Sequence, residues 1–317
     1  MPMEDQQWII RSIACHWLLA QLRIIQAESD GAINQKDIEH IHRMRVATRR
    51  ARAIYRIFEQ DFPTNKRRVW NKQLRSLTQA LGNARDTDVQ IEFIDSLIPN
   101  APKNAIPGLK RIRLRLWQYR EGLQYKVIQA IYRFNKSDII KDVQETIDSA
   151  QPIEQPLTYP LSLYKKSEQA IHLGIANVIQ WQSYIQDPRN ICELHETRIA
   201  IKWLRYTIET FLPLYQIDFN PSIKVLRSLQ DSLGIIHDCD VWESHIQTFV
   251  TEEKVQSANF YGSEQPFQFL LPGILFLKEN RKKKRDSLYI EFIEDWNKLI
   301  RNNYWQSLRE LVLVEDR

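Results

Sequence analysis

Residues 42–52 and 195–205 carry the same pattern of charge, and the prediction of the fold starts from this pattern. The first stretch reads HRMRVATRRAR and the second reads HETRIAIKWLR. In each, a His is followed by cations three, seven and ten residues later. Each residue of a helix turns the side-chain direction by about 100°, so these offsets fall within an arc of about 80°. The sequence therefore predicts two helices that each present a row of basic side chains, here called the basic rails.

The apolar residues of both stretches fall on a separate helix face. In the first stretch the centre of this face lies roughly 140° from the rail. Its members are Met44, Ala47, Ala51, Ile54, Tyr55 and Phe58, and the second stretch has Thr197, Ala200, Leu204, Ile208 and Phe211. One face is expected to pack into a core, while the other gathers like charges at an electrostatic cost. A bound anion would remove that cost.

Composition and charge are typical of a helical globular protein. Of the 317 residues, 43% are hydrophobic and 26% are charged, and only 8 are Gly, which favours helix over sheet. The net charge of +5 is unevenly distributed, since residues 40–75 hold eleven Lys or Arg against two acids. Local fields therefore matter more than the total charge.

Cysteine usage and hydropathy bear on the compartment. The three Cys, at positions 15, 192 and 239, have no CxxC spacing and fit neither a disulfide framework nor a zinc site. The most signal-like stretch, residues 8–22, follows acidic residues and is interrupted by Arg11 and His16. No run of 18 apolar residues is present, so we expect a cytoplasmic protein with neither export nor a membrane span.

Proline separates the segments that show helical periodicity. We predict eight helices, at about 4–28, 34–60, 65–97, 107–149, 161–185, 190–212, 221–256 and 272–312. The stretch from Pro152 to Pro160 has three prolines in nine residues and divides four helices from four. We therefore expect an all-α chain of two halves, 1–151 and 161–317, joined by a proline-rich segment at 152–160.

The two halves are related in sequence, which indicates an internal duplication. His42 aligns with His195 at an offset of 153, and the next segment aligns at an offset of 152. There the sequence KQLRSLTQALGNARDTD, residues 72–88, corresponds to KVLRSLQDSLGIIHDCD, residues 224–240. Two four-helix bundles follow from this arrangement.

The last helix of each half is also basic. Pro107 and Pro272 each begin one of these helices. One face of the first carries Lys110, Arg113 and Arg120 beside Trp117, and one face of the second carries Lys278, Arg281, Lys282 and Arg285. Basic side chains are thus predicted on a second element of each bundle.

The duplicated pattern His-x-x-Arg-(Val/Ile)-x-x-(Arg/Lys)-x-x-Arg, followed by Leu-Gly-x-x-x-Asp-x-Asp, resembles the CHAD family, the conserved histidine α-helical domain. The resemblance covers nearly the whole chain. It implies two four-helix bundles about a pseudo-twofold axis, with inorganic polyphosphate bound in a central basic channel. It also implies association with polyphosphate granules. The Glu-x-Glu-x-Lys signature of the triphosphatase domain that often precedes this family does not occur, so we expect a stand-alone module.

Carried over residue by residue, the resemblance implies that the basic rails and the helices after them line the channel. The residues are His42, Arg45, Arg49, Arg52, Lys72 and Arg75 in the first half and His195, Arg198, Lys202, Arg205, Lys224 and Arg227 in the second. To these we add the cations of the last helices, Arg113, Arg120, Lys278, Arg281, Lys282 and Arg285. Trp203 replaces Arg50, and His237 stands opposite Arg85, so the second half is expected to be the weaker side.

Polyphosphate offers charge and oxygen acceptors but no bases, which suits rows of Arg and Lys. We expect the Asp of each Leu-Gly-x-x-x-Asp-x-Asp segment to orient Arg or cap a helix, and Trp203 to be a core or wall residue. No Walker loop, Gly-x-Ser-x-Gly or HExxH occurs, so the sequence predicts neither an enzyme nor a cofactor.

Two other functions remain open at this stage. The same basic faces could bind RNA or DNA as a competing polyanion, although no exposed aromatic residues are interleaved with them. His40, His42 and His195 with Asp86 or Asp88 could chelate a metal ion, although His40 and His42 lie about 200° apart on a helix.

Overall fold

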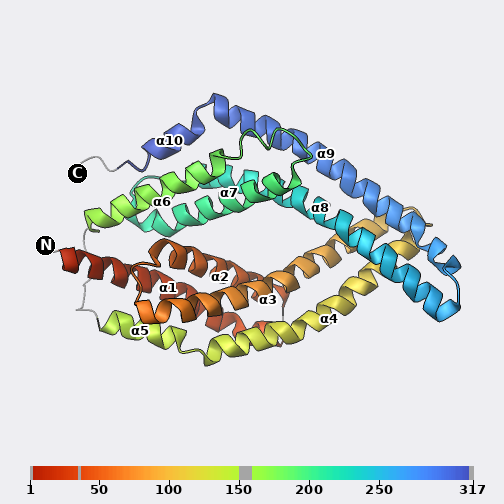
Figure 1. The fold of residues 1–317 in the computed structure, drawn as a ribbon, viewed down its shortest axis with the longest axis horizontal. Helices are drawn as coiled ribbons and strands as arrows, with labels where there is room; N and C mark the ends of the chain where they lie inside the picture. Colours follow the sequence, from red (N-terminus) through yellow and green to blue (C-terminus); the bar gives the residue numbers. More distant parts are fainter. Residues whose placement is uncertain (1–2, 35–36, 150–158, 314–317) are drawn as a thin grey trace.

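The computed structural model describes residues 3–34, 37–149 and 159–313, and every regular element in these ranges is helical (Figure 1). The α-helices are α1 (Met3–Ile33), α2 (Ile38–Phe58), α3 (Thr64–Leu97), α4 (Ile106–Lys136), α5 (Ile139–Asp148), α6 (Leu161–Ile179), α7 (Ile191–Phe211), α8 (Asn220–Tyr261), α9 (Leu271–Arg301) and α10 (Tyr304–Glu310). Three short 3-10 helices lie at Ile98–Asn100, Leu212–Leu214 and Gln265–Phe269. The all-α prediction is confirmed.

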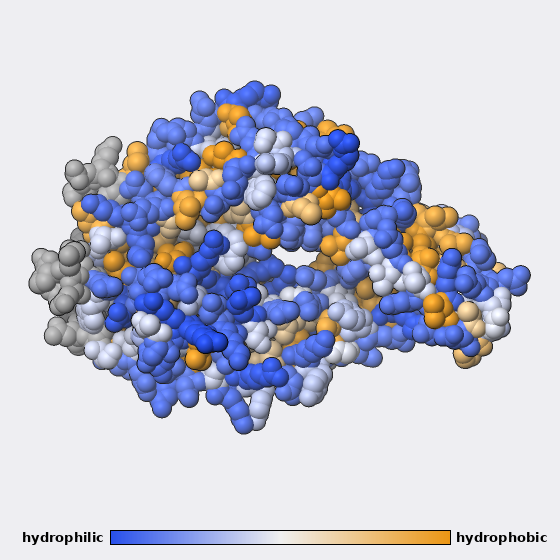
Figure 2. Space-filling view, viewed as in Figure 1, coloured by the Kyte–Doolittle hydropathy of each residue, from blue (hydrophilic) through white to orange (hydrophobic). Residues whose placement is uncertain are grey.

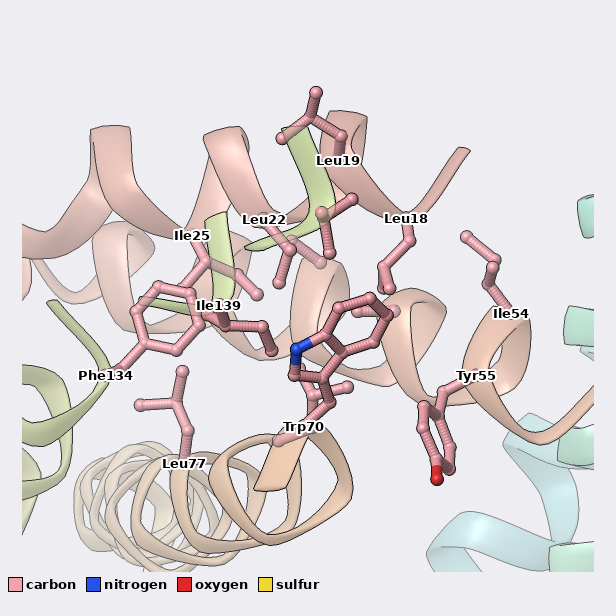
Figure 3. Close-up of a cluster of buried hydrophobic side chains, with 14 of the residues drawn as sticks. Leu18, Leu19, Leu22, Ile25, Ile54, Tyr55, Trp70, Leu77, Phe134 and Ile139 are labelled. Carbon is pink, nitrogen blue, oxygen red and sulfur yellow. The ribbon is translucent and has the colours of Figure 1, made fainter. Parts of the chain in front are cut away.

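The first half packs around one core formed mainly by α1 to α5, to which Leu163 of α6 and Phe211 of α7 also contribute. Trp70 of α3 is fully buried and points between Leu18 and Leu22 of α1 and Ile139 of α5 (Figure 3). The whole predicted apolar face of α2, from Met44 to Phe58, is buried in this core as well. Burying a side chain of this size contributes about 1.5–3 kcal/mol, so these contacts fix the orientation of α2 and of its basic rail.

The second half has its own core, to which α6 to α10 contribute. Ile171 and Ile201 are fully buried there, as is Trp296, whose ring centroid lies 5.5 Å from that of Trp305. Leu204 and Ile208 of the predicted apolar face of α7 are buried in this core, whereas Ala200 is only partly buried and Phe211 packs in the first core. Two separate cores are consistent with the predicted pair of bundles.

A third cluster forms where the long helices of the two halves meet. The outer ends of α3 and α4 cross those of α8 and α9 (Figure 1), and Ile94, Trp242 and Leu277 are buried between them. At the centre the starts of α4 and α9 touch. A Cβ atom on Gly108 would lie 2.9 Å from the Cα of Gly273, closer than ordinary contact. Only glycine permits this approach.

The predicted count of eight helices is wrong, because two long segments are interrupted. Segment 107–149 divides into α4 and α5 at Ser137, whose backbone is extended at φ −76° and ψ 139°. Segment 272–312 divides into α9 and α10 at Asn303, which adopts a left-handed φ of 51°. Asn tolerates this conformation better than most residues. Of the predicted joint 152–160, residues 152–158 lie outside the described residues.

Helix α1 is long and apolar enough over Gln7–Ile33 to cross a membrane by length and composition alone. Half of the most apolar stretch is buried inside the protein, where Leu18, Leu22 and Ile25 pack in the first core. The buried helix of a globular core has the same composition, which accounts for the hydropathy of α1.

A cavity lies between the two halves. Its volume is about 690 Å³, and residues of α2, α3, α7, α8 and α9 line it. Figure 2 shows an opening through the molecule in the same view as Figure 1, between α3 and α8 and inside the crossing of the long helices. The halves thus meet at α2 and α7 and again at the glycine crossing, with a polar space between.

Candidate functional site

The two basic rails converge on this cavity because α2 and α7 pack against each other across the interface. Arg45 and Arg49 extend from α2, and His195 and Arg198 extend from α7. Arg281 and Lys284 of α9 complete the cationic lining. Parts of two rails that lie 153 residues apart in sequence therefore face the same cavity.

Beside the cavity, where α2 meets α7, the basic side chains outnumber the nearby carboxylates. Burial, and after it repulsion by Arg49 and Arg198, lowers the pKa of Lys202 to about 7. The pKa values of Arg45 and Arg198 lie below their ordinary value, chiefly because of burial. We call Arg45, Arg49, Arg52, Arg198 and Lys202 the cation cluster.

Two carboxylates at the cavity partly offset this charge. Nη2 of Arg45 lies 2.7 Å from Oδ1 of Asp86, whose side chain is 63% exposed. Asp238 faces Arg198, and partial burial raises its pKa above the ordinary value while the guanidinium opposes that rise. Two acids beside five cations leave the cluster with an excess of positive charge.

The second Asp of each duplicated segment holds an Arg of the last helix in its half. Asp88 accepts from Nε of Arg120 at 2.7 Å, and both are buried. Gln124 accepts from the same guanidinium at 3.1 Å. In the second half Asp240 accepts from Nε of Arg285 at 2.5 Å. These contacts join α3 to α4 and α8 to α9, in line with the expectation that the aspartates orient Arg.

The two histidines of the rails occupy different environments. His42 is exposed on α2 and does not line the cavity. His195 does, and its Nδ1 lies 3.1 Å from Nδ1 of His237. Burial lowers the pKa of both rings, and that of His237 reaches about 4 because His195 and Arg198 also disfavour its charge. One ring nitrogen of the pair must donate and the other accept.

The other predicted site residues lie around the cluster or apart from it. Arg52 belongs to the cluster, whereas Arg205 donates to Glu209 at 2.7 Å and to Gln230 at 3.1 Å. Arg113 and Lys278 pair with Asp95 and Glu243 at 2.5 and 2.8 Å. The remaining predicted cations are exposed and do not line the cavity: Lys72, Arg75, Lys224, Arg227 and Lys282.

Several lining residues escaped the sequence prediction. Phe93 of α3 lies under the guanidinium of Arg281, whose Cζ is 3.6 Å from the ring centroid. Lys284 belongs to a basic run that resembles a solvated face. His237 and Asp238 follow the Leu-Gly of the second half, so only the alignment of the halves pointed to them.

The histidines proposed as metal ligands do not gather. Nδ1 of His40 lies 2.6 Å from Oε2 of Glu28, which Arg43 also binds, and this contact is away from the cavity. In the described part of the chain no three His, Cys, Asp or Glu side chains are placed to hold one ion.

Comparison with known proteins agrees with this architecture. The crystal structure of the CHAD domain from the plant Ricinus communis aligns with a TM-score of 0.60 and 21% identity, covering 96% of this chain and 91% of that one. PptA from Streptomyces chartreusis aligns with a TM-score of 0.56 and 13% identity, covering 90% and 99%. Both likenesses concern the fold alone. None of the curated proteins matches the sequence. Residues 16–247 match the CHAD domain, which is most of the length, and the chain therefore belongs to the CHAD family.

Proposed function

We propose that the protein binds inorganic polyphosphate at the cation cluster and along the cavity beside it. The observation that carries the proposal is the meeting of Arg45, Arg49 and Arg52 with Arg198 and Lys202 across the interface, where burial and the four Arg charges lower the pKa of Lys202. A linear polyanion would relieve this repulsion along its length. Family membership supports a function related to polyphosphate.

The chemistry of the lining suits a chain of phosphoryl groups. Each Arg offers a planar fork of donors to two oxygens, and Lys202 supplies a movable charge. Walls of low dielectric constant, such as those formed by Phe93 and Trp242, strengthen these interactions relative to open solvent. The opening between α3 and α8 would give a bound chain a way through the molecule.

The proposed role is binding rather than catalysis. The acidic groups that line the cavity are Asp86 and Asp238, each facing an Arg. Aspartates turned toward guanidinium groups orient them and lower the net charge. Such a site would hold the protein on polyphosphate granules in the cytoplasm.

Titration with long-chain polyphosphate tests the proposal. Affinity should exceed that for orthophosphate and fall steeply as salt rises, because bound phosphates release counterions. Arg49→Gln and Lys202→Gln should each weaken binding about tenfold and reduce the salt dependence, since charge-assisted contacts contribute about 1.5–3 kcal/mol. Lys141→Gln, which removes an exposed cation of α5, serves as the matched control.

Two outcomes would contradict polyphosphate binding. One is an affinity for long chains no better than for orthophosphate at the same salt. The other is displacement of bound polyphosphate by RNA at a lower concentration of charge, which would favour nucleic acid as the ligand.

A further inference from the structure

A second pocket lies beside the cation cluster, between α2, α6 and α7. Its volume is about 410 Å³, within the range of small-molecule sites. Trp181, Trp203 and Leu204 form much of its apolar wall, while Asn177 and Gln180 add amide groups at its edge. Arg56 of α2 reaches into the same space.

This pocket has a twin in the other half, built from the equivalent positions. The twin lies between α1, α2 and α7 and has a volume of about 280 Å³. The offset of 153 relates eight lining positions of the two pockets. On α2 and α7 the pairs are Ala53 with Tyr206, Arg56 with Glu209, Ile57 with Thr210, Trp203 with Arg50 and Thr207 with Ile54. On α6 and α1 they are Ala170 with Trp17, Leu173 with Ala20 and Gly174 with Gln21. The two pockets can therefore be compared residue by residue at equivalent positions of the duplication.

The twin is smaller, and its cations are paired with a carboxylate. Trp17 and Tyr206 stand where the larger pocket has Ala170 and Ala53. Glu209 binds Arg205 at 2.7 Å and lies 3.4 Å from Arg50. A ligand would find less space there, and the cations Arg50 and Arg205 already have a carboxylate partner.

The larger pocket has more space, and among the residues that the structure describes its two Arg side chains lack such a partner. The guanidinium carbons of Arg52 and Arg56 lie 5.7 and 5.1 Å from the ring centroid of Trp203. Neither Arg forms an ion pair with a carboxylate in the ranges that the structure describes. Arg52 is also a near neighbour of Arg49, whose charge helps to lower its pKa after the effect of burial. Positive charge thus runs from the aromatic pocket into the cation cluster.

We propose that this pocket binds the base of a nucleoside polyphosphate whose phosphates lie on Arg56 and Arg52 and extend toward the cation cluster. Planar aromatic and guanidinium groups favour stacking with a base, and the Asn177 and Gln180 amides suit its polar edge. Glu196, also in the lining, can accept from a ribose hydroxyl. The phosphate end of this assignment rests on the proposed function, whereas the base end rests on the pocket.

Calorimetric titration with ATP and with inorganic tripolyphosphate, both in EDTA at equal ionic strength, tests the assignment. Tripolyphosphate carries the higher negative charge because ATP has one phosphate esterified, so charge alone favours tripolyphosphate. We expect ATP to bind about tenfold more tightly, a difference typical of one stacked base. Equal or weaker binding of ATP would overturn the proposal, as would an RNA oligonucleotide that binds more tightly than ATP.

Variants connect the preference to the pocket. Ala170→Trp, which installs the residue of the twin, and Trp203→Ala should each abolish the preference for ATP over tripolyphosphate. Arg50→Gln, in the twin, should leave the ratio of the two affinities unchanged. Circular dichroism checks that each variant folds. A preference for ATP that persists in both Ala170→Trp and Trp203→Ala would show that the base does not bind in this pocket.

The failures of the two proposals are distinguishable. Tight, salt-sensitive binding of long polyphosphate without a preference for ATP would reject only the nucleotide pocket. A preference for ATP together with long-chain binding no better than orthophosphate would reject only the proposed function.

Discussion

Arg45 of α2 and Asp86 of α3 lie 2.7 Å apart at the edge of the cavity, and Asp86 also lowers the electrostatic cost of Arg198 on α7. This carboxylate belongs to the first half yet acts on cations of both halves. In the free protein it therefore offsets part of the positive charge that a bound phosphate is proposed to offset. Its side chain is mostly exposed, so the contact contributes little to stability.

Asp86→Asn should strengthen polyphosphate binding by about threefold to tenfold, because the substitution frees Arg45 and removes a repelling charge. The dissociation constant at fixed salt is the measurement. Glu92→Gln on the same helix, which frees Arg85 from a 3.1 Å ion pair, is the matched control and should have a smaller effect because neither residue lines the cavity. Weaker binding by Asp86→Asn would show that the carboxylate positions Arg45 for the ligand.

Lys202→Met should stabilise the fold while weakening polyphosphate binding. The folded-state pKa of about 7 lies below the value near 10.4 of an unfolded lysine. Between these values the unfolded chain binds more protons, so this lysine makes stability rise with pH, and its full penalty is present below pH 7. We expect a gain on the order of 2 kcal/mol at pH 6 in urea unfolding, which diminishes toward pH 10. A loss of stability at pH 6 would contradict the burial penalty.

Polyphosphate binding should weaken as the pH rises above 7. Bound phosphate raises the pKa of Lys202, so binding above pH 7 takes up a proton, and affinity falls by up to about tenfold per pH unit until the bound pKa is reached. Calorimetry in buffers of different ionisation enthalpy measures this proton uptake. Lys202→Arg, which stays charged, is the control and should give a nearly flat profile. An equal slope in that variant would assign the proton to another group.

Asp88→Asn should destabilise the first half by about 3 kcal/mol in urea unfolding, because it leaves the guanidinium of Arg120 buried without its counter-charge. Asp95→Asn, on the same helix, breaks a pair with Arg113 in which both side chains are over 40% exposed, and it should change stability by less than about 1 kcal/mol. Equal effects of the two substitutions would show that burial of the Arg120 pair is unimportant.

The sequence predicted most helices and the separation of the basic rails from the apolar faces of α2 and α7, because both depend on local periodicity. Arg45 and Arg198 follow from the phase of α2 and α7 once the apolar faces are placed in cores. Carboxylate chemistry predicted that the second Asp of each duplicated segment orients an Arg. The sequence did not show which Arg that would be.

Contacts between helices far apart in sequence were beyond the same reasoning. The pairing of Arg205 with Glu209 lies one helical turn apart and could have been noticed, but the meeting of Arg52 with Trp203 depends on how α2 crosses α7. The breaks at Ser137 and Asn303 carry no Gly or Pro, so periodicity continued through them. The crossing of Gly108 and Gly273 depends on the lengths of four helices beyond their bundles.

That glycine crossing closes a ring. Because α4 and α9 touch at one end of the opening and α2 and α7 at the other, a long chain that passes through must enter by a terminus unless the crossing separates. Association would then depend on the concentration of chain ends rather than of phosphate units, and a cyclic polyphosphate would be excluded. Dissociation would be slowest for the longest chains, since each must slide out over its whole length.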